Sequence, residues 1–116
     1  MYRIDGNILE IGEKTIHFRY PVRNSIGYHG RVIVLVGIPF EDTNTINNIV
    51  CYASDGELIW QVEDMKKRYP DWGVYAYQPY ESMGIDKGII YASTFNGWCY
   101  HIDPENGKLL GYHFTK

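Results

Sequence analysis

An internal repeat constrains the fold of this chain more than any other feature of its sequence. When the segment around residue 50 is shifted by forty-eight places, residues of the same type fall on one another. The matched pairs are Asn48 with Asn96, Cys51 with Cys99, Tyr52 with Tyr100 and, after three additional residues, Gly56 with Gly107. Each copy is typical of a strand, a Gly-containing turn and a second strand. A period of roughly 40 to 50 residues indicates an array of similar small sheets.

The composition favours strands within one domain. Apolar residues make up 45% of the chain, which includes eleven Tyr, three Trp and four Phe. This content is too aromatic for a disordered chain, and the excess of Tyr, Ile, Val and Trp favours strands over helices. A length of 116 residues corresponds to one domain with a hydrophobic core. We therefore expect a single β domain over residues 1–116 with two and a half copies of the repeat.

Alternating apolar residues and turn residues place the strands. The two clear hairpins are expected at 49–62 and 98–114, where Asp-Gly and Asn-Gly supply the positive φ of a tight turn. A weaker third copy covers residues 8–20, and further strands are expected at 74–77 and 88–94. Residues 32–38 are apolar on both faces, which predicts a covered central strand. The total is about eight strands, nearly all antiparallel and joined in sequence order.

The remaining segments are expected to be loops, apart from one short helix. The helix is expected at residues 63–69, and Pro70 with Gly73 ends it. The expected connections are the polar stretch 23–30, the loop 39–47 and the loop 78–86.

The repeated pattern resembles blades of the quinoprotein-type (PQQ-like) β-propellers. Tyr-His-Ile-Asp-Pro-Glu-Asn-Gly-Lys-Leu-Leu, residues 100–110, is similar to that blade signature. Residues 52–60 look like a shortened version that keeps Trp60, the residue that docks one blade on the next in that family. In the last copy Gly111 stands where this Trp would be. The resemblance covers most of the chain from residue 15 onward and implies a sheet geometry, but no catalytic residue.

The number of copies conflicts with a closed ring. Propellers need four or more blades, and this chain supplies two and a half. We therefore expect an all-β antiparallel meander that forms an open, propeller-blade-like pair of packed sheets. Exposed sheet edges must be protected, so such a fold favours a protein partner or a homo-oligomer.

The sequence contains no pattern of a catalytic or metal site, so we expect a protein that is not an enzyme and holds no cofactor or metal. The four histidines lack metal-ligand spacing, and His101 with His113 could face each other across the last hairpin. Hydroxyl-nucleophile, phosphate-binding and dinucleotide motifs do not occur. Cys51 and Cys99 are expected to be small buried side chains, because matched positions on successive blades lie too far apart for most disulfides.

Charge gives the first candidate binding residues. The net charge of −3 and the sequence pI of 5.7 argue against direct binding of nucleic acid. The sequence shows neither a secretion signal nor a membrane-length apolar run, so a cytoplasmic protein without membrane contact is expected. Between residues 41 and 64 there are carboxylates but no Lys or Arg. They are Glu41, Asp42, Asp55, Glu57, Glu63 and Asp64. Such a segment can steer a basic partner, or it can simply keep an aromatic protein soluble.

Aromatic residues give the second group of candidates. Five lie within residues 69–80, around a segment rich in Pro and Gly. Tyr75 and Tyr77 share one face of the expected strand 74–77 and are expected in the core. Trp72 and Tyr80 are expected in loops and are the better candidates for contact with a partner.

These features indicate a non-enzymatic protein-binding module. By physical type it looks like a small bacterial immunity protein that binds and blocks a basic toxin domain, for example a nuclease. The alternatives are a small-molecule or carbohydrate-binding β-sheet domain and a self-assembling, propeller-like structural subunit.

Overall fold

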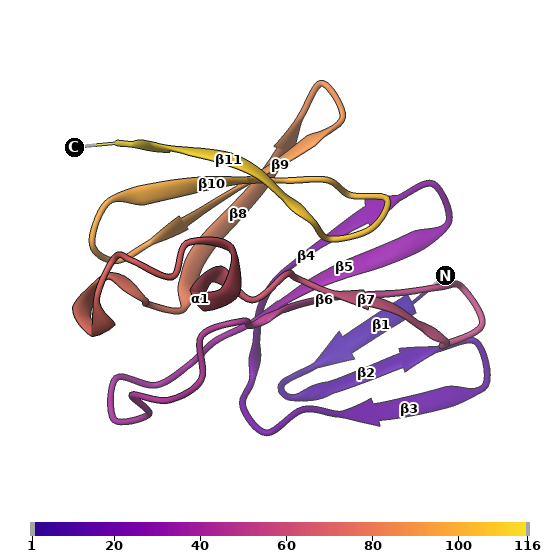
Figure 1. Cartoon of the computed structure of the whole chain (residues 1–116). Coiled ribbons are helices and arrows are strands. Elements are labelled where there is room, and N and C mark those ends of the chain that lie inside the picture. Colours follow the sequence, from indigo (N-terminus) through magenta and orange to yellow (C-terminus); the bar gives the residue numbers. More distant parts are fainter. Residues whose placement is uncertain (1, 116) are drawn as a thin grey trace.

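The computed structural model describes residues 2–115, and within these residues eleven strands form three antiparallel sheets (Figure 1). The N-terminal sheet contains β1 (Tyr2–Asp5), β2 (Ile8–Ile11) and β3 (Lys14–His17). The central sheet contains β4 (Val22–Tyr28), β5 (Arg31–Val36), β6 (Ile49–Tyr52) and β7 (Leu58–Gln61). The C-terminal sheet contains β8 (Tyr80–Asp86), β9 (Ile89–Thr94), β10 (Trp98–Ile102) and β11 (Leu109–Phe114). In each sheet neighbouring strands follow one another in sequence.

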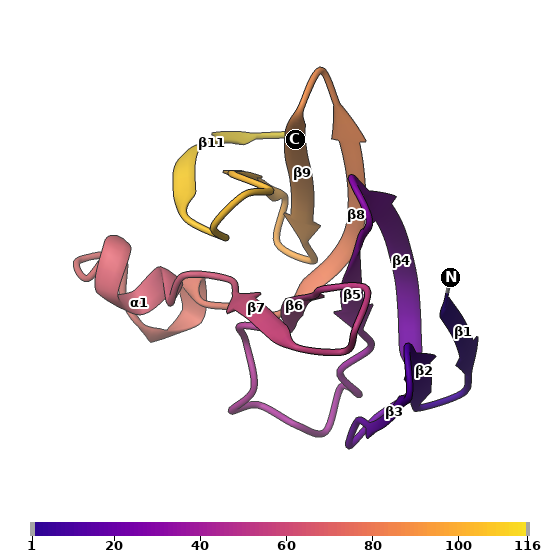
Figure 2. The same cartoon turned by 90° about the vertical axis from the view of Figure 1, so that its right-hand side faces the viewer.

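The central sheet lies between the N-terminal and the C-terminal sheets (Figure 2). One hydrophobic cluster lies on each of its faces. Alternate residues of β5 point to opposite faces. Val32 and Val34 pack with Leu9 of the N-terminal sheet, while Ile33 and Leu35 belong to the cluster that includes the C-terminal sheet. This arrangement confirms the expectation of a covered central strand at residues 32–38.

Buried Asn48 joins the central sheet to the C-terminal sheet. Its side-chain amide donates to Val36 O at 2.8 Å and to Tyr80 O at 2.9 Å, and its Oδ1 accepts from Tyr80 N at 2.9 Å. One side chain therefore satisfies the backbone at the end of β5 and the start of β8. β4 and β8, the first strands of their sheets, also lie against each other, and Asn24 Nδ2 donates to Met83 O at 2.9 Å.

An open all-β antiparallel fold is confirmed, with eleven strands and three sheets among residues 2–115 in place of about eight strands and two sheets. The segments 23–30 and 78–86, expected as loops, contain β4 and β8. Their Asn, Ser and Gly residues obscure the alternation, but β4 pairs with the apolar β5 and β8 with β9, whose alternate residues are buried. Pairing with an apolar strand thus outweighs the weak strand propensity of these two segments.

The short elements between β7 and β8 differ in one respect from expectation. The helix α1 (Met65–Arg68) lies within the expected range. Residues 74–77 were expected as a strand, but Val74–Ala76 form a 3-10 helix. Gly73, with a φ of 85°, and Pro79 flank this turn and prevent a continuous strand.

Among the described residues no helix is long and apolar enough to cross a membrane. The thiols of Cys51 and Cys99 are both free and buried.

Candidate functional site

The loops that enter and leave the sheets at one end of the molecule surround a cavity of about 450 Å³. We call this the loop end of the molecule. It is the end of the central sheet at which Leu35 of β5 pairs with Ile49 of β6. The opposite end of the central sheet, which carries the turn at residues 53–57, is called the turn end. The lining comes from Glu81 of β8 and from three loops, which follow β5, precede β8 and follow β9. The cavity is lined by Ile38, Pro39, Phe40, Asp42, Thr43, Tyr75, Tyr77, Gln78, Pro79, Glu81 and Phe95.

Three large aromatic side chains at this cavity are almost fully exposed to solvent. Phe40 is 94% exposed, Tyr75 is 89% exposed and Phe95 is 83% exposed. Each comes from a different loop, so only the tertiary structure brings them to one cavity. We call these three side chains the aromatic rim. Large apolar side chains gathered on a surface mark binding sites more often than they serve stability.

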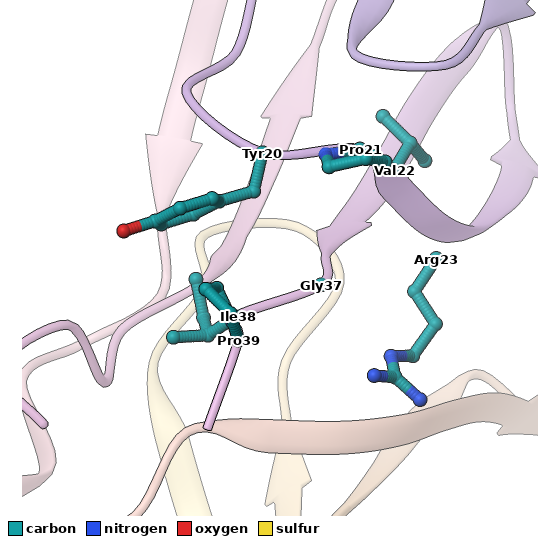
Figure 3. A pocket seen from close by; sticks show the side chains of 7 residues that line it. All are labelled: Tyr20, Pro21, Val22, Arg23, Gly37, Ile38 and Pro39. Atoms are coloured by element: carbon teal, nitrogen blue, oxygen red, sulfur yellow. The ribbon is translucent and has the colours of Figure 1, made fainter. Parts of the chain in front are cut away.

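A second hollow of about 350 Å³ adjoins the first and shares Ile38 and Pro39 with it. Figure 3 shows its lining, with Tyr20 and Arg23 on opposite sides of Gly37. The Arg23 guanidinium lies 3.5 Å from the carboxylate of Glu81, which lines the first cavity. The loop end is therefore hollowed over a wider area than the first cavity alone.

Asp42 holds the 39–47 loop in place beside both hollows. Its carboxylate accepts hydrogen bonds from Asn44 N at 2.9 Å, from the Tyr20 hydroxyl at 2.8 Å and from Thr45 Oγ1 at 2.8 Å. These donors, with the backbone of Asn44 the strongest, hold the pKa of Asp42 well below its usual range. The loop that carries Phe40 is thus built around an ionised carboxylate.

The six carboxylates expected to form one acidic surface are divided between the two ends of the central sheet. Asp55 and Glu57 lie at the 53–57 turn, where Glu57 pairs with Lys14 at 2.8 Å. Glu41 and Asp42 lie in the loop at the other end, and Asp42 is already hydrogen-bonded within its loop.

The other two carboxylates follow β7 and also have partners inside the protein. Glu63 accepts from Leu109 N at 2.8 Å and so bridges two sheets. Asp64 caps α1, accepting from Lys66 N at 3.1 Å, and it also accepts from Asn47 Nδ2 at 3.1 Å. A continuous run in the sequence therefore does not give a continuous acidic patch, because the chain reverses at the 53–57 turn.

The two aromatic candidates have different environments. Trp72 is half-buried and stacks between Tyr69, at a ring distance of 4.3 Å, and Trp98, at 5.1 Å. Tyr80 was expected in a loop on the surface, but it begins β8 and is 1% exposed. The expectation that Tyr80 contacts a partner is corrected by this burial.

The sequence patterns did not predict the aromatic rim. Phe40 and Phe95 are isolated aromatics in polar loops, and Tyr75 was placed in the core because residues 74–77 were expected as a strand. The useful signal was present in the sequence as residues that break a strand: Phe40 follows Pro39, Phe95 precedes Asn96, and Tyr75 lies two residues after Gly73.

A separate group of potential metal ligands lies on the last hairpin. His101 Nε2 and His113 Nδ1 are 2.7 Å apart, so the two rings do face each other as expected. Cys99 Sγ lies with them, all three ligand atoms being within 4.8 Å of one another. Burial, and secondarily His113, holds the pKa of His101 below its usual value. Cys51 is the residue of the central sheet that matches Cys99 in the repeat. Burial raises the pKa of the Cys51 thiol to about 11.

Comparisons with known proteins support the fold and leave the activity open. A family model described as a domain of unknown function (DUF7957) matches residues 1–114. Among solved structures, the crystal structure of the computationally designed Ika8 protein is similar, with a TM-score of 0.58 at 10% sequence identity. The match covers 97% of this chain and 35% of the designed chain, so this chain spans about a third of that protein's length. No curated protein matches the chain.

Proposed function

The chain belongs to the DUF7957 family, and we propose that it is a non-enzymatic protein-binding module whose anchors are the aromatic rim. The observation that carries this proposal is the exposure of Phe40, Tyr75 and Phe95, each above 80%, at one cavity of about 450 Å³. A buried aromatic side chain removes roughly 150–250 Å² from water. Aromatic anchors of this kind supply most of the energy in protein interfaces.

The rim lies on loops that a rigid scaffold supports. Asp42 fixes the loop of Phe40, and Asn96 Nδ2 donates to Ala76 O at 3.3 Å, which links the loop of Phe95 to the turn of Tyr75. Such fixing lowers the entropy that a partner must overcome when it orders these loops. The arrangement is therefore suited to pre-organised recognition.

The partner class that we propose is a basic toxin domain, which makes the protein a bacterial immunity protein of the cytoplasm. The net charge is −3, and the acidic side chains Glu41 and Asp42 lie at or beside the hollows, as does Glu81, which pairs with Arg23. Carboxylates around an aromatic anchor favour a basic partner and speed its approach. The toxin would be blocked by occlusion of its active site, with no chemical step in this protein.

The test uses the protein encoded beside the gene for this chain, produced as a catalytically inactive variant. Titration calorimetry is expected to give a 1:1 complex. The double variant Phe40→Ser/Phe95→Ser is expected to lower the affinity about 1,000-fold, because two anchors worth about 2 kcal/mol each are removed. Leu58→Ser is the matched control, since Leu58 is 58% exposed but lies beside the turn at the other end of the central sheet.

A growth assay tests the immunity part of the proposal separately. Bacteria that express the active neighbouring protein are expected to grow only when the wild-type chain or Leu58→Ser is co-expressed. Equal affinity of wild type and the double variant contradicts the rim as the binding surface. A complex that forms without rescuing growth contradicts immunity but not protein binding.

The cavity volume favours a second candidate, a small-molecule or carbohydrate-binding domain. A volume of about 450 Å³ is within the range of about 300–1,000 Å³ for ligand sites, which are commonly lined by aromatic residues. A thermal-shift screen of sugars and nucleosides separates the two functions. A ligand that raises Tm of the wild type but not of Tyr75→Ser favours this second candidate.

A further inference from the structure

We propose that Cys99, His101 and His113 form a binding site for Zn²⁺ or a chemically similar divalent transition metal. The site joins the two last strands, which lie side by side (Figure 1). None of its residues lines the cavity of the aromatic rim, and the proposal is independent of the function proposed above.

Strand geometry brings the three side chains to one face. Cys99 and His101 are two residues apart on β10, so they point to the same side of the sheet. His113 on β11 pairs directly with Cys99 and therefore points to that side as well. The opposite side carries Tyr100 and Ile102, which pack against the central sheet.

Space beside His101 allows the two imidazoles to approach each other. Gly111 pairs with His101 and contributes no side chain. Tyr91 on β9 also pairs with His101, and their rings meet edge to face with centroids 5.0 Å apart. His101 is thus supported on one side and free to turn toward His113 on the other.

The internal repeat provides a comparison within the same molecule. Cys51 matches Cys99, and on the central sheet it pairs with Trp60, in the position that His113 holds opposite Cys99. Ala53 matches His101 by the same forty-eight-residue shift. In the central sheet Cys51 and Trp60 belong to the hydrophobic cluster that the central and C-terminal sheets share. On the matching face of the C-terminal sheet the corresponding residues are the buried Cys99, the partly buried His101 and the exposed His113.

The donor set fits zinc better than a hard cation. One thiolate and two imidazoles are borderline-soft ligands, which select Zn²⁺ and its neighbours over Mg²⁺ or Ca²⁺. Bonds of about 2.0–2.3 Å in a tetrahedron place donor atoms roughly 3.3–3.6 Å apart. The two histidine nitrogens, now 2.7 Å apart, would have to separate by roughly 0.6 Å to reach that geometry. All three donor atoms already lie within 4.8 Å of one another. Three protein ligands leave a fourth position open to water or to a group of a partner.

The test is a titration of the purified, reduced chain with Co²⁺, which reports a thiolate ligand by its charge-transfer absorption. We expect one equivalent of Co²⁺ to bind and to produce this absorption. Added Zn²⁺ is then expected to displace the bound Co²⁺. Cys99→Ser should abolish the charge-transfer band. His113→Gln changes an exposed side chain and leaves the core intact. It should weaken Co²⁺ binding by more than about 100-fold, because about 100-fold is the largest effect expected when a residue only supports a ligand and does not itself bind the metal.

His17→Gln is the control, because His17 is also an exposed strand histidine. It should bind Co²⁺ as the wild type does. Three outcomes overturn the proposal: no stoichiometric binding at micromolar Co²⁺, binding without the thiolate band, or wild-type affinity in His113→Gln. Circular dichroism of each variant tests whether it is folded. If Cys99→Ser unfolds, the Co²⁺ affinity of His113→Gln decides whether the metal site exists.

Discussion

The indole of Trp60 lies directly over Gly107, and this contact joins the central sheet to the turn of the C-terminal sheet. A Cβ at position 107 would lie 2.5 Å from Trp60 Cε3, and Trp60 Nε1 donates to Pro104 O at 3.0 Å. The N-terminal sheet repeats the contact with a different side chain, since a Cβ at Gly56 would lie 2.8 Å from Lys14 Cδ. In each case the closing strand of one sheet covers the glycine turn of the next. This contact is the structural role of the repeated glycines.

Gly107→Ala is expected to lower the free energy of unfolding by about 3 kcal/mol. The φ of 76° strains an alanine by about 1 kcal/mol, and the collision with Trp60 adds the cost of overpacking, about 1–3 kcal/mol. Urea denaturation measures the change. Gly88→Ala is the matched control: its φ is 78°, but nothing lies within 4 Å of the added carbon. Equal losses in the two variants would contradict the importance of the Trp60 contact.

Asn48→Ala is expected to lower the free energy of unfolding by about 3 kcal/mol or more, because it leaves three buried backbone groups without their partner. Asn96, the matched residue of the repeat, is half-buried and donates to Ala76 O at the longer distance of 3.3 Å. Asn96→Ala should cost about 1 kcal/mol. Thermal and urea unfolding of both variants check the difference. A larger loss of stability in Asn96→Ala than in Asn48→Ala would contradict the importance given to the hydrogen bonds of Asn48.

Tyr80→Phe is expected to leave the protein as stable as the wild type or more stable by about 1 kcal/mol. The Tyr80 hydroxyl is buried and has no hydrogen-bond partner among residues 2–115, so its removal relieves a desolvation cost. Burial also raises the pKa of Tyr80 above its usual value. Tyr77→Phe is the control, since the Tyr77 hydroxyl donates to Tyr69 O, and it should lose about 1 kcal/mol. Destabilisation by Tyr80→Phe would reveal a partner such as a buried water.

The aromatic rim should contribute little to stability. Phe40→Ser and Phe95→Ser are each expected to change the free energy of unfolding by less than about 0.5 kcal/mol, as for other surface substitutions. Trp72→Ala should instead cost about 3 kcal/mol, because this ring is stacked between two others. Denaturation of the three variants in parallel is the measurement. A large loss at Phe40 would mean that the ring packs within the protein and is not held for a partner.

Asp42 should make stability depend on pH. Its pKa is lower in the folded protein than in the unfolded chain, so its contribution is complete above the ordinary carboxyl value of about 4. That contribution is lost as the pH falls through the folded value. Unfolding of the wild type between about pH 5 and 2 should therefore show a steeper loss of stability than Asp42→Asn. Tyr20→Phe, which removes one donor to the carboxylate, should be intermediate. Parallel pH profiles of wild type and Asp42→Asn would contradict this role.

The sequence predicted the correct element wherever a local pattern of alternation or turn residues coincided with a buried face. The hairpins around Gly56 and Gly107, the covered strand 32–38 and the short helix at 63–69 were all predicted from alternation and turn residues. β4 and β8 were not, because Ser82, Gly84 and similar residues carry no strand signal of their own. These strands form because β5 and β9 offer apolar edges for pairing.

The candidate site was less predictable than the fold. Glu41 and Asp42 were correctly placed in a loop, but the acidic run as a whole was divided between the two ends of the central sheet. The expected burial was wrong for both Tyr75 and Tyr80. Tyr75 is exposed in a 3-10 helix that replaces the expected strand, and Tyr80 is buried where β8 begins. A one-dimensional cluster of charge or aromatic residues carries no information about the chain reversals within it.

The sequence by itself determined an all-β antiparallel chain built from a repeated hairpin, because strand propensity, alternation and glycine turns act over a few neighbouring residues. The tertiary structure decided how many sheets form, which strands pair, and which side chains meet. Phe40, Tyr75 and Phe95 gather at one cavity only because three separate loops leave the sheets at the same end. The physical reason is that pairing and packing energies depend on contacts between distant segments, and no local pattern encodes them.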